Sequence, residues 1–324
     1  MTSNPAEHTL NGKLVVLLGG SGFVGRHLAQ QLLAQGARLR IASRNPERSY
    51  RLKPLGNLGQ VQFVRCDITS DQSVTRALSG ADALVNLVGI FAGELDAIQG
   101  SGLGKVAVAA RAAGLSALVH VSANGADPGS ASAYGRSKAA GEAAILAGFP
   151  GATILRPSVL FGPDDKFLNL FAKLIAMLPV VPVFGPDKRL QPLFVDDAAL
   201  AIAATLADPA RHGGKVYELG GPEALTMLEL HQRIATAQGR KGLFVPLPDV
   251  ASAAFATATG WLPFAPLTRD QWRMLAAGNA LPGEHPGIAA LGVEPRPLAL
   301  FLDRWMVQYR THGRFGITPA ANLH

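Results

Sequence analysis

The sequence predicts an α/β protein: a doubly wound parallel sheet with a smaller C-terminal α/β cap domain. Short apolar runs alternate with helical patterns through the first half of the chain, and a glycine-rich loop follows the first run. After Pro157 the sequence becomes rich in Pro, Phe and Leu. Apolar strands joined by helices are typical of a parallel sheet with both faces covered. Right-handed crossovers would then place a ligand at the carboxyl ends of the strands.

Each expected strand is a short run of β-branched and apolar residues. The runs are KLVVLLG (13–19), ARLRIAS (37–43), VQFVRCD (61–67), DALVNLVG (82–89), ALVHVSA (117–123) and ATILRP (152–157). Helical patterns lie between them, over 22–36, 73–80, 95–114 and 133–148. The segment 189–207 is expected to return to the sheet as a strand and a helix. We therefore expect a sheet domain of residues 1–157 with 189–207, and a cap of residues 158–188 with 208–324.

Composition limits the class of protein. Hydrophobic residues make up 48% of the 324 residues and charged residues 16%, which is enough apolar material for a substantial core. The single cysteine, Cys66, excludes an internal disulfide and fits a reducing compartment. The eight histidines are scattered without a CxxC or HExxH motif, so no metal site is expected. The net charge of +7 is spread along the chain, and we expect no nucleic-acid binding.

Membrane insertion is not expected from the sequence either. The N-terminus lacks the basic and apolar pattern of a secretory signal. No uninterrupted apolar run reaches the roughly 18 residues that a membrane-spanning helix needs.

The stretch GGSGFVGRH, from Gly19 to His27, predicts a dinucleotide-binding loop. In the pattern G-x-x-G-x-x-G, one glycine permits a tight turn, one lets the backbone approach a pyrophosphate, and one lets helix and strand pack closely. A purely structural turn is the alternative, but the placement between a strand and an amphipathic helix favours a nucleotide. The expected contacts here are Gly19, Ser21, Gly22, Phe23, Val24, Gly25 and Arg26.

The end of the second expected strand indicates which nucleotide is bound. An acidic residue would be expected there to hold the ribose of NAD, but the chain has Ser43 and Arg44. A hydroxyl and a guanidinium suit the 2′-phosphate of NADP(H); a solvated loop arginine is the alternative. Asp67, which ends the third strand, could accept a hydrogen bond from the adenine amino group or cap a local turn. Further cofactor contacts are expected at Ile68, Leu87, Val88, Gly89 and Pro157.

A candidate catalytic group follows the fifth strand. Tyr134 and Lys138 are spaced i and i+4, so they share one face of a helix, and a nearby cation lowers the pKa of a tyrosine. Ser122, at the end of the preceding strand, could hydrogen-bond the same substrate oxygen. The alternative is structural: Tyr134 packs under the cap and Lys138 holds a ribose without any chemistry.

These motifs, in this order, resemble the short-chain dehydrogenase/reductase superfamily in its extended and atypical branch. The motifs are GGSGFVGRH, the strand-end Asp67, NLVG at 86–89, HVSA at 120–123, Tyr134-x-x-x-Lys138, Pro157 in LRPSVLFGP and Asp196-Asp197 in FVDDAA. The resemblance implies a Rossmann domain followed by a smaller substrate domain. The glycine loop is LGGSG, where the superfamily more often has TGxxG.

A narrower resemblance, over nearly the whole chain, is to the nucleotide-binding accessory subunits of respiratory complex I and their bacterial relatives. It is carried by NLVGI, RPSVLFGPDDKFLN, VYELGGPEALT and FLDRWMVQYRTHGRFG. Members hold NADPH as a structural ligand beside the quinone-reducing arm. The resemblance implies NADP(H) as cofactor, Tyr134 and Lys138 on the cofactor side, and subunits of that arm as partners. It also implies a peripheral position on the cytoplasmic side of the cell membrane, in contact with the membrane surface.

Two other functions fit the same residues. The first is a soluble, free-standing NAD(P)-dependent reductase, dehydrogenase or epimerase that uses Ser122, Tyr134 and Lys138 for turnover. The second is a sensor of the NADP(H) redox state. The C-terminal aromatics would form an interface in the accessory subunit, or the core of the cap; they are Trp261, Phe264, Trp272 and Trp305.

Overall fold

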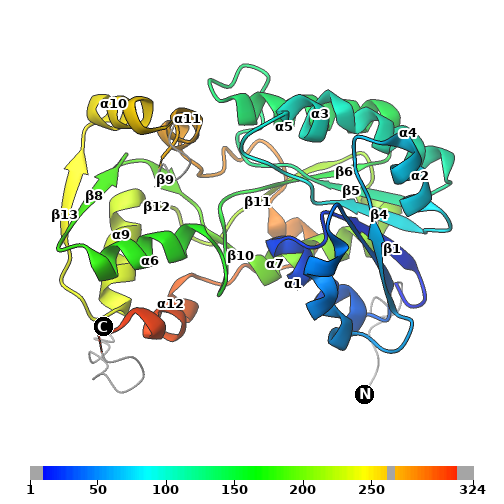
Figure 1. The fold of residues 1–324 in the computed structure, drawn as a ribbon, viewed down its shortest axis with the longest axis horizontal. Helices are drawn as coiled ribbons and strands as arrows, with labels where there is room; N and C mark the ends of the chain where they lie inside the picture. Colours follow the sequence, from blue (N-terminus) through cyan, green and yellow to red (C-terminus); the bar gives the residue numbers. More distant parts are fainter. Residues whose placement is uncertain (1–9, 261–266, 312–324) are drawn as a thin grey trace. The chain divides into compact units, whose positions relative to one another are not determined.

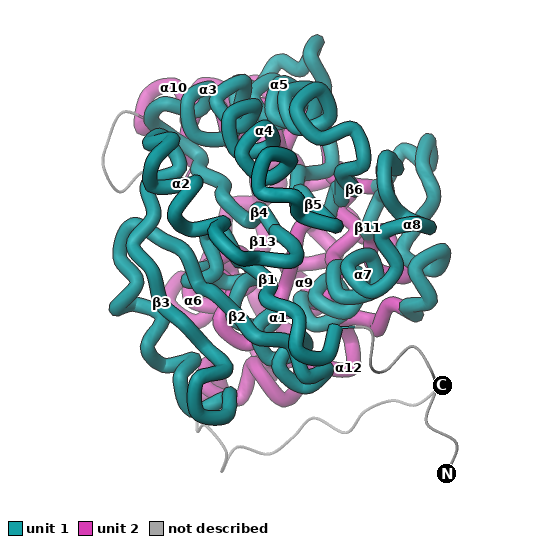
Figure 2. The backbone as a smooth tube through the Cα atoms, turned by 90° about the vertical axis from the view of Figure 1, so that its right-hand side faces the viewer, with its two compact units in different colours: residues 1–157, 195–219, 281–294 teal, residues 158–194, 220–280, 295–324 magenta. Residues whose placement is uncertain are grey.

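The computed structural model describes residues 10–260 and 267–311. The chain divides into two compact units, which Figure 2 shows in different colours. Unit 1 comprises residues 1–157, 195–219 and 281–294, and unit 2 comprises residues 158–194, 220–280 and 295–324.

Unit 1 is built on a seven-stranded sheet in which all neighbouring strands run parallel (Figure 1). Its strands are β1 (Leu14–Leu18), β2 (Arg38–Ser43), β3 (Val61–Arg65), β4 (Ala83–Asn86), β5 (Ala117–Val121), β6 (Thr153–Pro157) and β11 (Val216–Leu219). The strand order is β11-β6-β5-β4-β1-β2-β3. The chain first adds β2 and β3 on one side of β1 and then adds β4, β5, β6 and β11 on its other side, which is the doubly wound arrangement. The predicted fold class is confirmed.

Helices cover both faces of this sheet (Figure 1). One face carries α2 (Asp71–Leu78), α3 (Leu95–Gln99), α4 (Gly104–Ala112) and α5 (Ala133–Gly148), and the other carries α1 (Phe23–Ala34) and α7 (Val195–Ala207). The central strands β1 and β4 are buried along their whole length, because helices exclude water from both sides. The shorter elements are α8 (Pro209–His212) and the 3₁₀ segments Pro46–Leu55, Ser101–Leu103 and Ile288–Leu291.

The helical pattern at 95–114 forms two helices rather than one. The carboxylate of Asp96 accepts a hydrogen bond from the backbone N–H of Ser101 at 2.9 Å, and α3 ends at Gln99. Gly100 follows with non-helical angles (φ −102°, ψ −133°), and one 3₁₀ turn leads into α4. A side chain that bonds the backbone ahead of it competes with the helical bonds there, and this explains the break.

The return of the chain to the sheet differs from the expected range 189–207. The segments β9 (Arg189–Leu190) and β10 (Leu193–Phe194) belong to unit 2, and the return begins with α7. It continues to residue 219, because β11 pairs with β6 as a seventh parallel strand, and residues 281–294 also join unit 1. The sequence places VYEL in the cap because a helical pattern of the cap follows it closely, and the pairing of β11 with β6 corrects this prediction.

Unit 2 is a mixed α/β unit with three two-stranded sheets in its described part. Its strands are β7 (Leu160–Phe161), β8 (Val180–Phe184), β9, β10, β12 (Leu225–Thr226) and β13 (Leu243–Leu247). Its helices are α6 (Phe167–Met177), α9 (Met227–Ala237), α10 (Asp249–Thr259), α11 (Arg269–Ala277), α12 (Ala299–Trp305) and a 3₁₀ turn at Met306–Tyr309.

Aromatic side chains form part of the core of unit 2. The rings of Phe194 and Phe301 stack at 4.1 Å between centroids, and those of Phe301 and Trp305 at 4.8 Å. Trp272 is 7% exposed. These two tryptophans therefore pack within the unit, whereas Trp261 and Phe264 lie outside the described residues. Among the helices that the structure describes, none has both the length and the hydropathy to cross a bilayer.

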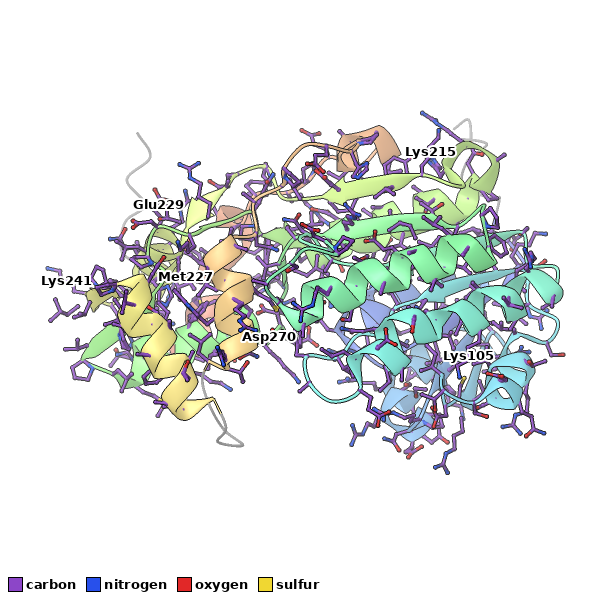
Figure 3. All side chains as sticks on the ribbon, turned by 90° about the horizontal axis from the view of Figure 1, so that it is seen from above. Lys105, Lys215, Met227, Glu229, Lys241 and Asp270 are labelled. Atoms are coloured by element: carbon purple, nitrogen blue, oxygen red, sulfur yellow. The ribbon has the colours of Figure 1, made fainter. Side chains whose placement is uncertain are left out.

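Two glycines let α5 lie close against α3 and α4, which run beside it in Figure 3. A Cβ added to Gly141 would lie 2.2 Å from the carbonyl oxygen of Gln99, and one added to Gly148 would lie 2.6 Å from the Cβ of Ala107. Such contacts leave no room for any side chain. The position of α5 above the sheet therefore depends on these glycines.

We expect Gly141→Ala to lower the free energy of unfolding by about 2–3 kcal/mol, because α5 must move away from α3. Gly104→Ala is the matched control, since its Cβ would meet the nearest atom, on Ala144, at 3.7 Å. That variant should be neutral or more stable by about 0.5 kcal/mol. Urea denaturation measures both. Equal stability of the two variants would contradict the close contact of α5 with α3.

Candidate functional site

The predicted site residues gather where the parallel strands of unit 1 end. Ser43 is the last residue of β2, Pro157 the last of β6, and Ser122 directly follows β5. Asn86 is the last residue of β4, so Leu87, Val88 and Gly89 form the loop that leaves this strand. Because all these strands point the same way, residues far apart in the sequence meet along one edge of the sheet.

The glycine loop joins β1 to α1 with the geometry that its pattern predicts. Gly19 has φ +78°, where a side chain would be strained, and its Cβ would lie 3.2 Å from the backbone of Leu87 and Val88. A Cβ on Gly25 would lie 2.5 Å from the carbonyl oxygen of Gly20, so only glycine lets the first turn of α1 lie this close to the turn after β1. Gly22 is the exposed N-cap of α1 and makes no side-chain cap.

This geometry leaves the start of α1 available to an anion. The first backbone N–H groups of a helix have no partner within the helix, and the helix dipole attracts negative charge to them. Ser21, Phe23 and Val24 are half-buried around this turn. The Arg26 Nε donates to the carbonyl oxygen of Gly22 at 3.4 Å, which holds the guanidinium stem beside the loop.

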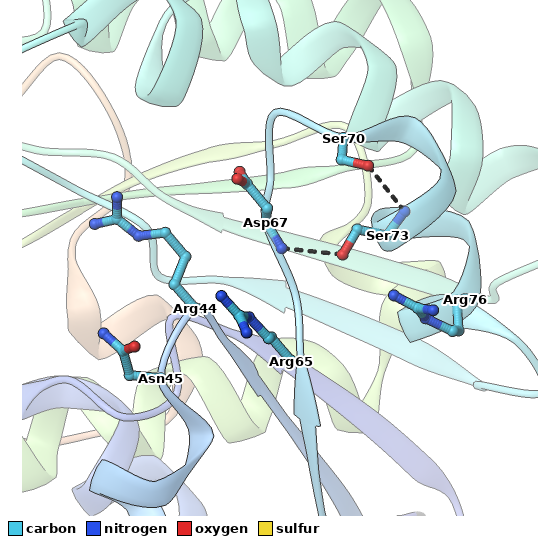
Figure 4. Close-up of a pocket in the computed structure, with 7 residues that line it drawn as sticks. All are labelled: Arg44, Asn45, Arg65, Asp67, Ser70, Ser73 and Arg76. Atoms are coloured by element: carbon cyan, nitrogen blue, oxygen red, sulfur yellow. Dashed lines mark hydrogen bonds between the residues drawn. The ribbon is translucent and has the colours of Figure 1, made fainter.

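A cationic pocket of about 580 Å³ lies beside the ends of β2 and β3 (Figure 4). Its lining residues are Arg44, Asn45, Arg65, Asp67, Ser70, Ser73 and Arg76. The sequence indicated Arg44 and Asp67 but missed Arg65 and Arg76. Arg65 is the exposed last residue of β3, two positions before Asp67. Arg76 is exposed on α2, about one helical turn after Ser73. The position of Arg65 follows from the pairing of β2 with β3 rather than from a motif, and Arg76 reaches the pocket from α2.

Ser43 and Asp67 differ in how they are engaged at this pocket. The hydroxyl oxygen of Ser43 is buried and has no hydrogen-bond partner among the described residues. Asp67 accepts hydrogen bonds at one carboxylate oxygen from the Thr69 N–H (2.9 Å) and the Thr69 hydroxyl (2.7 Å), which lowers the pKa of Asp67. Asp67 therefore caps a local turn, as the alternative to adenine binding predicted, and its charge also faces the arginines of the pocket.

The remaining predicted contacts lie at or just after the ends of β3, β4 and β6. Ile68 is buried beneath the end of β3, and the Val88 N–H donates to the side-chain oxygen of Asn86 at 3.1 Å. A Cβ on Gly89 would meet the Lys138 Nζ at 3.6 Å, so this loop approaches the ammonium group closely. Pro157 accepts a hydrogen bond from the Asn124 N–H at 2.8 Å, which fixes the loop after β5.

Tyr134 and Lys138 lie on one face of α5, as their spacing predicts. The Ser132 hydroxyl caps the helix by accepting from the N–H groups of Tyr134 and Gly135. The Lys138 Nζ lies 5.9 Å from the centroid of the Tyr134 ring and donates to the carbonyl oxygen of Val121 at 3.2 Å. The ring of Phe91 stacks on that of Tyr134 at 4.9 Å.

The expected lowering of the tyrosine pKa is not found. Burial raises the pKa of Tyr134 to about 12, and burial also lowers the pKa of Lys138 to about 8. Desolvation outweighs the attraction of an ammonium group that is 5.9 Å from the ring. Tyr134 is thus a neutral phenol at physiological pH rather than a group poised to lose its proton.

Three buried polar residues around this face were not found from the sequence. Gln99 accepts from the Ile90 N–H (2.8 Å) and donates to the Ser137 hydroxyl (2.9 Å), so it ties the loop after β4 to α5. Asn86 and His120 are joined at 3.1 Å beneath the site. The pKa of His120 is lowered by burial and then by the charge of Lys138, so its ring is neutral. Asn86 and His120 open the motifs NLVG and HVSA as isolated polar residues in apolar strands, whereas Gln99 lies in α3 and has no such signal.

The residues fit a bound dinucleotide at both ends of the strand edge. The buried hydroxyl oxygens of Ser43 and Ser122 have no hydrogen-bond partner among the described residues, and buried polar atoms are normally paired. Ser43 borders the arginines at the end of β2, and Ser122 follows β5 beside the helix of Tyr134. Between them, the exposed Gly22 leaves the start of α1 open. The site thus offers polar groups for both halves of a dinucleotide.

Comparison with known proteins agrees with this fold. The family model of the NAD dependent epimerase/dehydratase family matches residues 15–220. The mitochondrial NADH dehydrogenase [ubiquinone] 1 alpha subcomplex subunit 9 of Arabidopsis thaliana is 32% identical over 97% of this chain and 83% of that protein. The ceramide reductase of Caulobacter vibrioides is 31% identical over 73% of this chain and 74% of that protein.

A solved structure supports the fold at lower sequence identity. The triphenylmethane reductase of Citrobacter sp., crystallised with NADP(H), superposes with a TM-score of 0.73 at 21% identity, covering 90% of this chain and 99% of that one. The family model covers the glycine loop, the strand-end residues and the Tyr134–Lys138 helix, and it extends to the end of β11. The chain belongs to the NAD dependent epimerase/dehydratase family.

Proposed function

We propose that this protein is an NADP(H)-binding accessory subunit of respiratory complex I that holds its nucleotide for structure or assembly rather than for turnover. The observation that carries the proposal is the extent of the similarity to the complex I subunit of Arabidopsis thaliana, which spans 97% of this chain. The match therefore includes both units, whereas the family model ends at residue 220.

The arginine pocket supports NADP(H) as the nucleotide. The pocket has a surplus of two positive charges. Its lining holds one carboxylate, from Asp67, and three guanidinium groups, from Arg44, Arg65 and Arg76. A phosphate monoester carries about 1.5 to 2 negative charges near pH 7. The fork of an arginine also matches phosphate geometry. The buried Ser43 hydroxyl would donate to a phosphate or ribose oxygen at the same place.

The other predicted contacts would hold the rest of the nucleotide. The start of α1 at Gly22 would bind the pyrophosphate, and Lys138 would donate to the hydroxyls of the second ribose. The nicotinamide of a bound NADP(H) can give or accept a hydride. For turnover, Tyr134 would have to move a proton to or from a substrate oxygen, with Ser122 as a second hydrogen-bonding group.

The electrostatics of Tyr134 favour retention over turnover. Efficient proton transfer needs a pKa near the working pH, but burial raises the pKa of Tyr134 to about 12. Phe91 also covers one face of the phenol ring. Tyr134 and Lys138 then serve to position the nucleotide, which is the role expected of vestigial catalytic residues.

The proposal includes a place in the cell. We infer a peripheral position beside the quinone-reducing arm of complex I, on the cytoplasmic side of the membrane and touching its surface. The net charge of +7 suits anionic lipid headgroups or acidic partner subunits. Cys66 is buried and unpaired, which fits a reducing compartment.

A free-standing NADP(H)-dependent reductase is the second candidate, and one observation favours it. The Ser122 hydroxyl is buried without a partner among the described residues, as a hydrogen-bond donor awaiting a substrate oxygen would be. The Caulobacter vibrioides relative is named a reductase, although its similarity covers 73% of this chain.

We expect Arg44→Ala and Arg65→Ala each to weaken NADPH binding at least about tenfold, because each removes a charge-assisted hydrogen bond to the 2′-phosphate. NADH binding should change less than about threefold. Fluorescence titration of nucleotide-free protein measures both. Arg48→Ala is the control, since Arg48 is exposed and lies outside the pocket lining. An equal loss for NADPH and NADH would rule out the 2′-phosphate contact.

A tagged form of the chain should recover subunits of the quinone-reducing arm of complex I from detergent-solubilised membranes. Tyr134→Phe should recover the same subunits and the same amount of nucleotide, because the phenol is not used for turnover. Mass spectrometry of the recovered material reads out both. Recovery without any complex I subunit would overturn the proposal. The reductase alternative predicts instead that Tyr134→Phe abolishes turnover and leaves nucleotide affinity intact.

A further inference from the structure

A buried carboxylate on the edge strand of unit 1 has no part in the nucleotide site. Glu218, in β11, is 1% exposed. The chain segment that rejoins this unit at residues 281–294 covers it: the Glu218 N–H donates to the Pro286 carbonyl oxygen at 3.0 Å. The Gly283 N–H donates to the Glu218 Oε2 at 2.9 Å. The other oxygen, Oε1, is buried and has no hydrogen-bond partner in the described part of the chain.

The nearby arginine is already engaged by another acid. Arg156 pairs with Glu218 across the β6–β11 ladder, so both side chains lie on the same face of the sheet. The Arg156 guanidinium, however, donates twice to Glu142, at 3.0 and 2.7 Å. That pair raises the pKa of Arg156, and the charges of Glu218 and Glu284 raise it further. Three carboxylates around one guanidinium leave two negative charges uncompensated.

Glu284 and His285 complete a set of metal-ligand atoms with Glu218. One carboxylate oxygen from each glutamate and one imidazole nitrogen lie within 4.8 Å of one another. Glu284 is exposed and His285 half-buried, so water can reach the remaining coordination positions. An imidazole with two carboxylates is a ligand set that Zn²⁺ accepts, with water completing the tetrahedron.

We propose that Glu218, Glu284 and His285 bind a divalent metal ion, with Zn²⁺ as the best match. The ion would supply the partner that the buried Oε1 lacks and neutralise the two uncompensated charges. It would also fasten residues 283–287 to the edge of the sheet, where Glu218 and Gly287 already form a bridge. Its role is structural: it locks the returning segment of unit 1 in place.

The sequence predicts no metal site, because these three ligands do not form a recognisable motif in it. Glu284 and His285 are adjacent in the sequence, but two consecutive residues of these types do not form a recognised metal-binding motif. Glu218 lies far upstream in an apolar run and approaches them only because the segment at 281–294 returns to the sheet.

The test is calorimetric titration of the full chain with Zn²⁺ after treatment with a chelator. Wild-type protein should bind one Zn²⁺ at this site, and its Tm should rise by about 2–4 °C when Zn²⁺ exceeds its Kd tenfold or more. Glu284→Gln and His285→Ala should each lose at least tenfold in affinity together with the Tm rise. Both residues are accessible to solvent, so the metal-free variants should fold like the wild type.

Glu294→Gln is the matched control, because Glu294 is an exposed acid on the same returning segment. It should bind Zn²⁺ like the wild type. The proposal is overturned if wild-type protein binds no Zn²⁺, or if Glu284→Gln and His285→Ala bind it as tightly as Glu294→Gln does.

Discussion

The parallel register of the central sheet is the constraint on which the rest of unit 1 depends. Leu18 of β1 lies opposite Ala42 of β2 and Asn86 of β4, so neighbouring strands end nearly level. The loops that leave the strands at this edge therefore lie side by side and can border one ligand. Gly25 serves the same arrangement locally, because it lets the first turn of α1 lie against the backbone of Gly20, in the turn that follows β1. Without this register and this glycine, the arginine pocket and helix α5, which carries Tyr134, would not border the same ligand.

The two ends of this edge differ in how deeply their titratable side chains are buried. Around the pocket at the end of β2, the arginine side chains are exposed and can reach an anion. Around Tyr134 and Lys138, burial favours the neutral forms, which raises one pKa and lowers the other. The binding end thus presents several guanidinium groups, while the phenol at the chemical end is held in its neutral form. This contrast is the physical basis for preferring retention of the nucleotide over turnover.

Sequence reasoning succeeded where a local rule decides the structure. The glycine loop, the strand-end serines and the i, i+4 spacing of Tyr134 and Lys138 each follow from a few neighbouring residues. It failed where distant segments decide: β11 joins the sheet only through pairing with β6, and Arg65 meets Arg44 only through pairing of β2 with β3. The pKa of Tyr134 could not be foreseen either, because spacing gives the distance to Lys138 but not the burial that dominates. Asp67 lies between these two cases. The sequence allowed it either to bind adenine or to cap a turn, and its hydrogen bonds from Thr69 show that it caps the turn.

The central claim is that this protein holds NADP(H) and keeps it. The most direct measurement is mass spectrometry of the nucleotide released by denaturing the natively purified protein, before and after incubation with isotope-labelled NADPH. The account predicts close to one NADP(H) per chain, with little label incorporated over hours. A chain that releases no nucleotide, releases NAD(H) without the 2′-phosphate, or exchanges its nucleotide within seconds would contradict it.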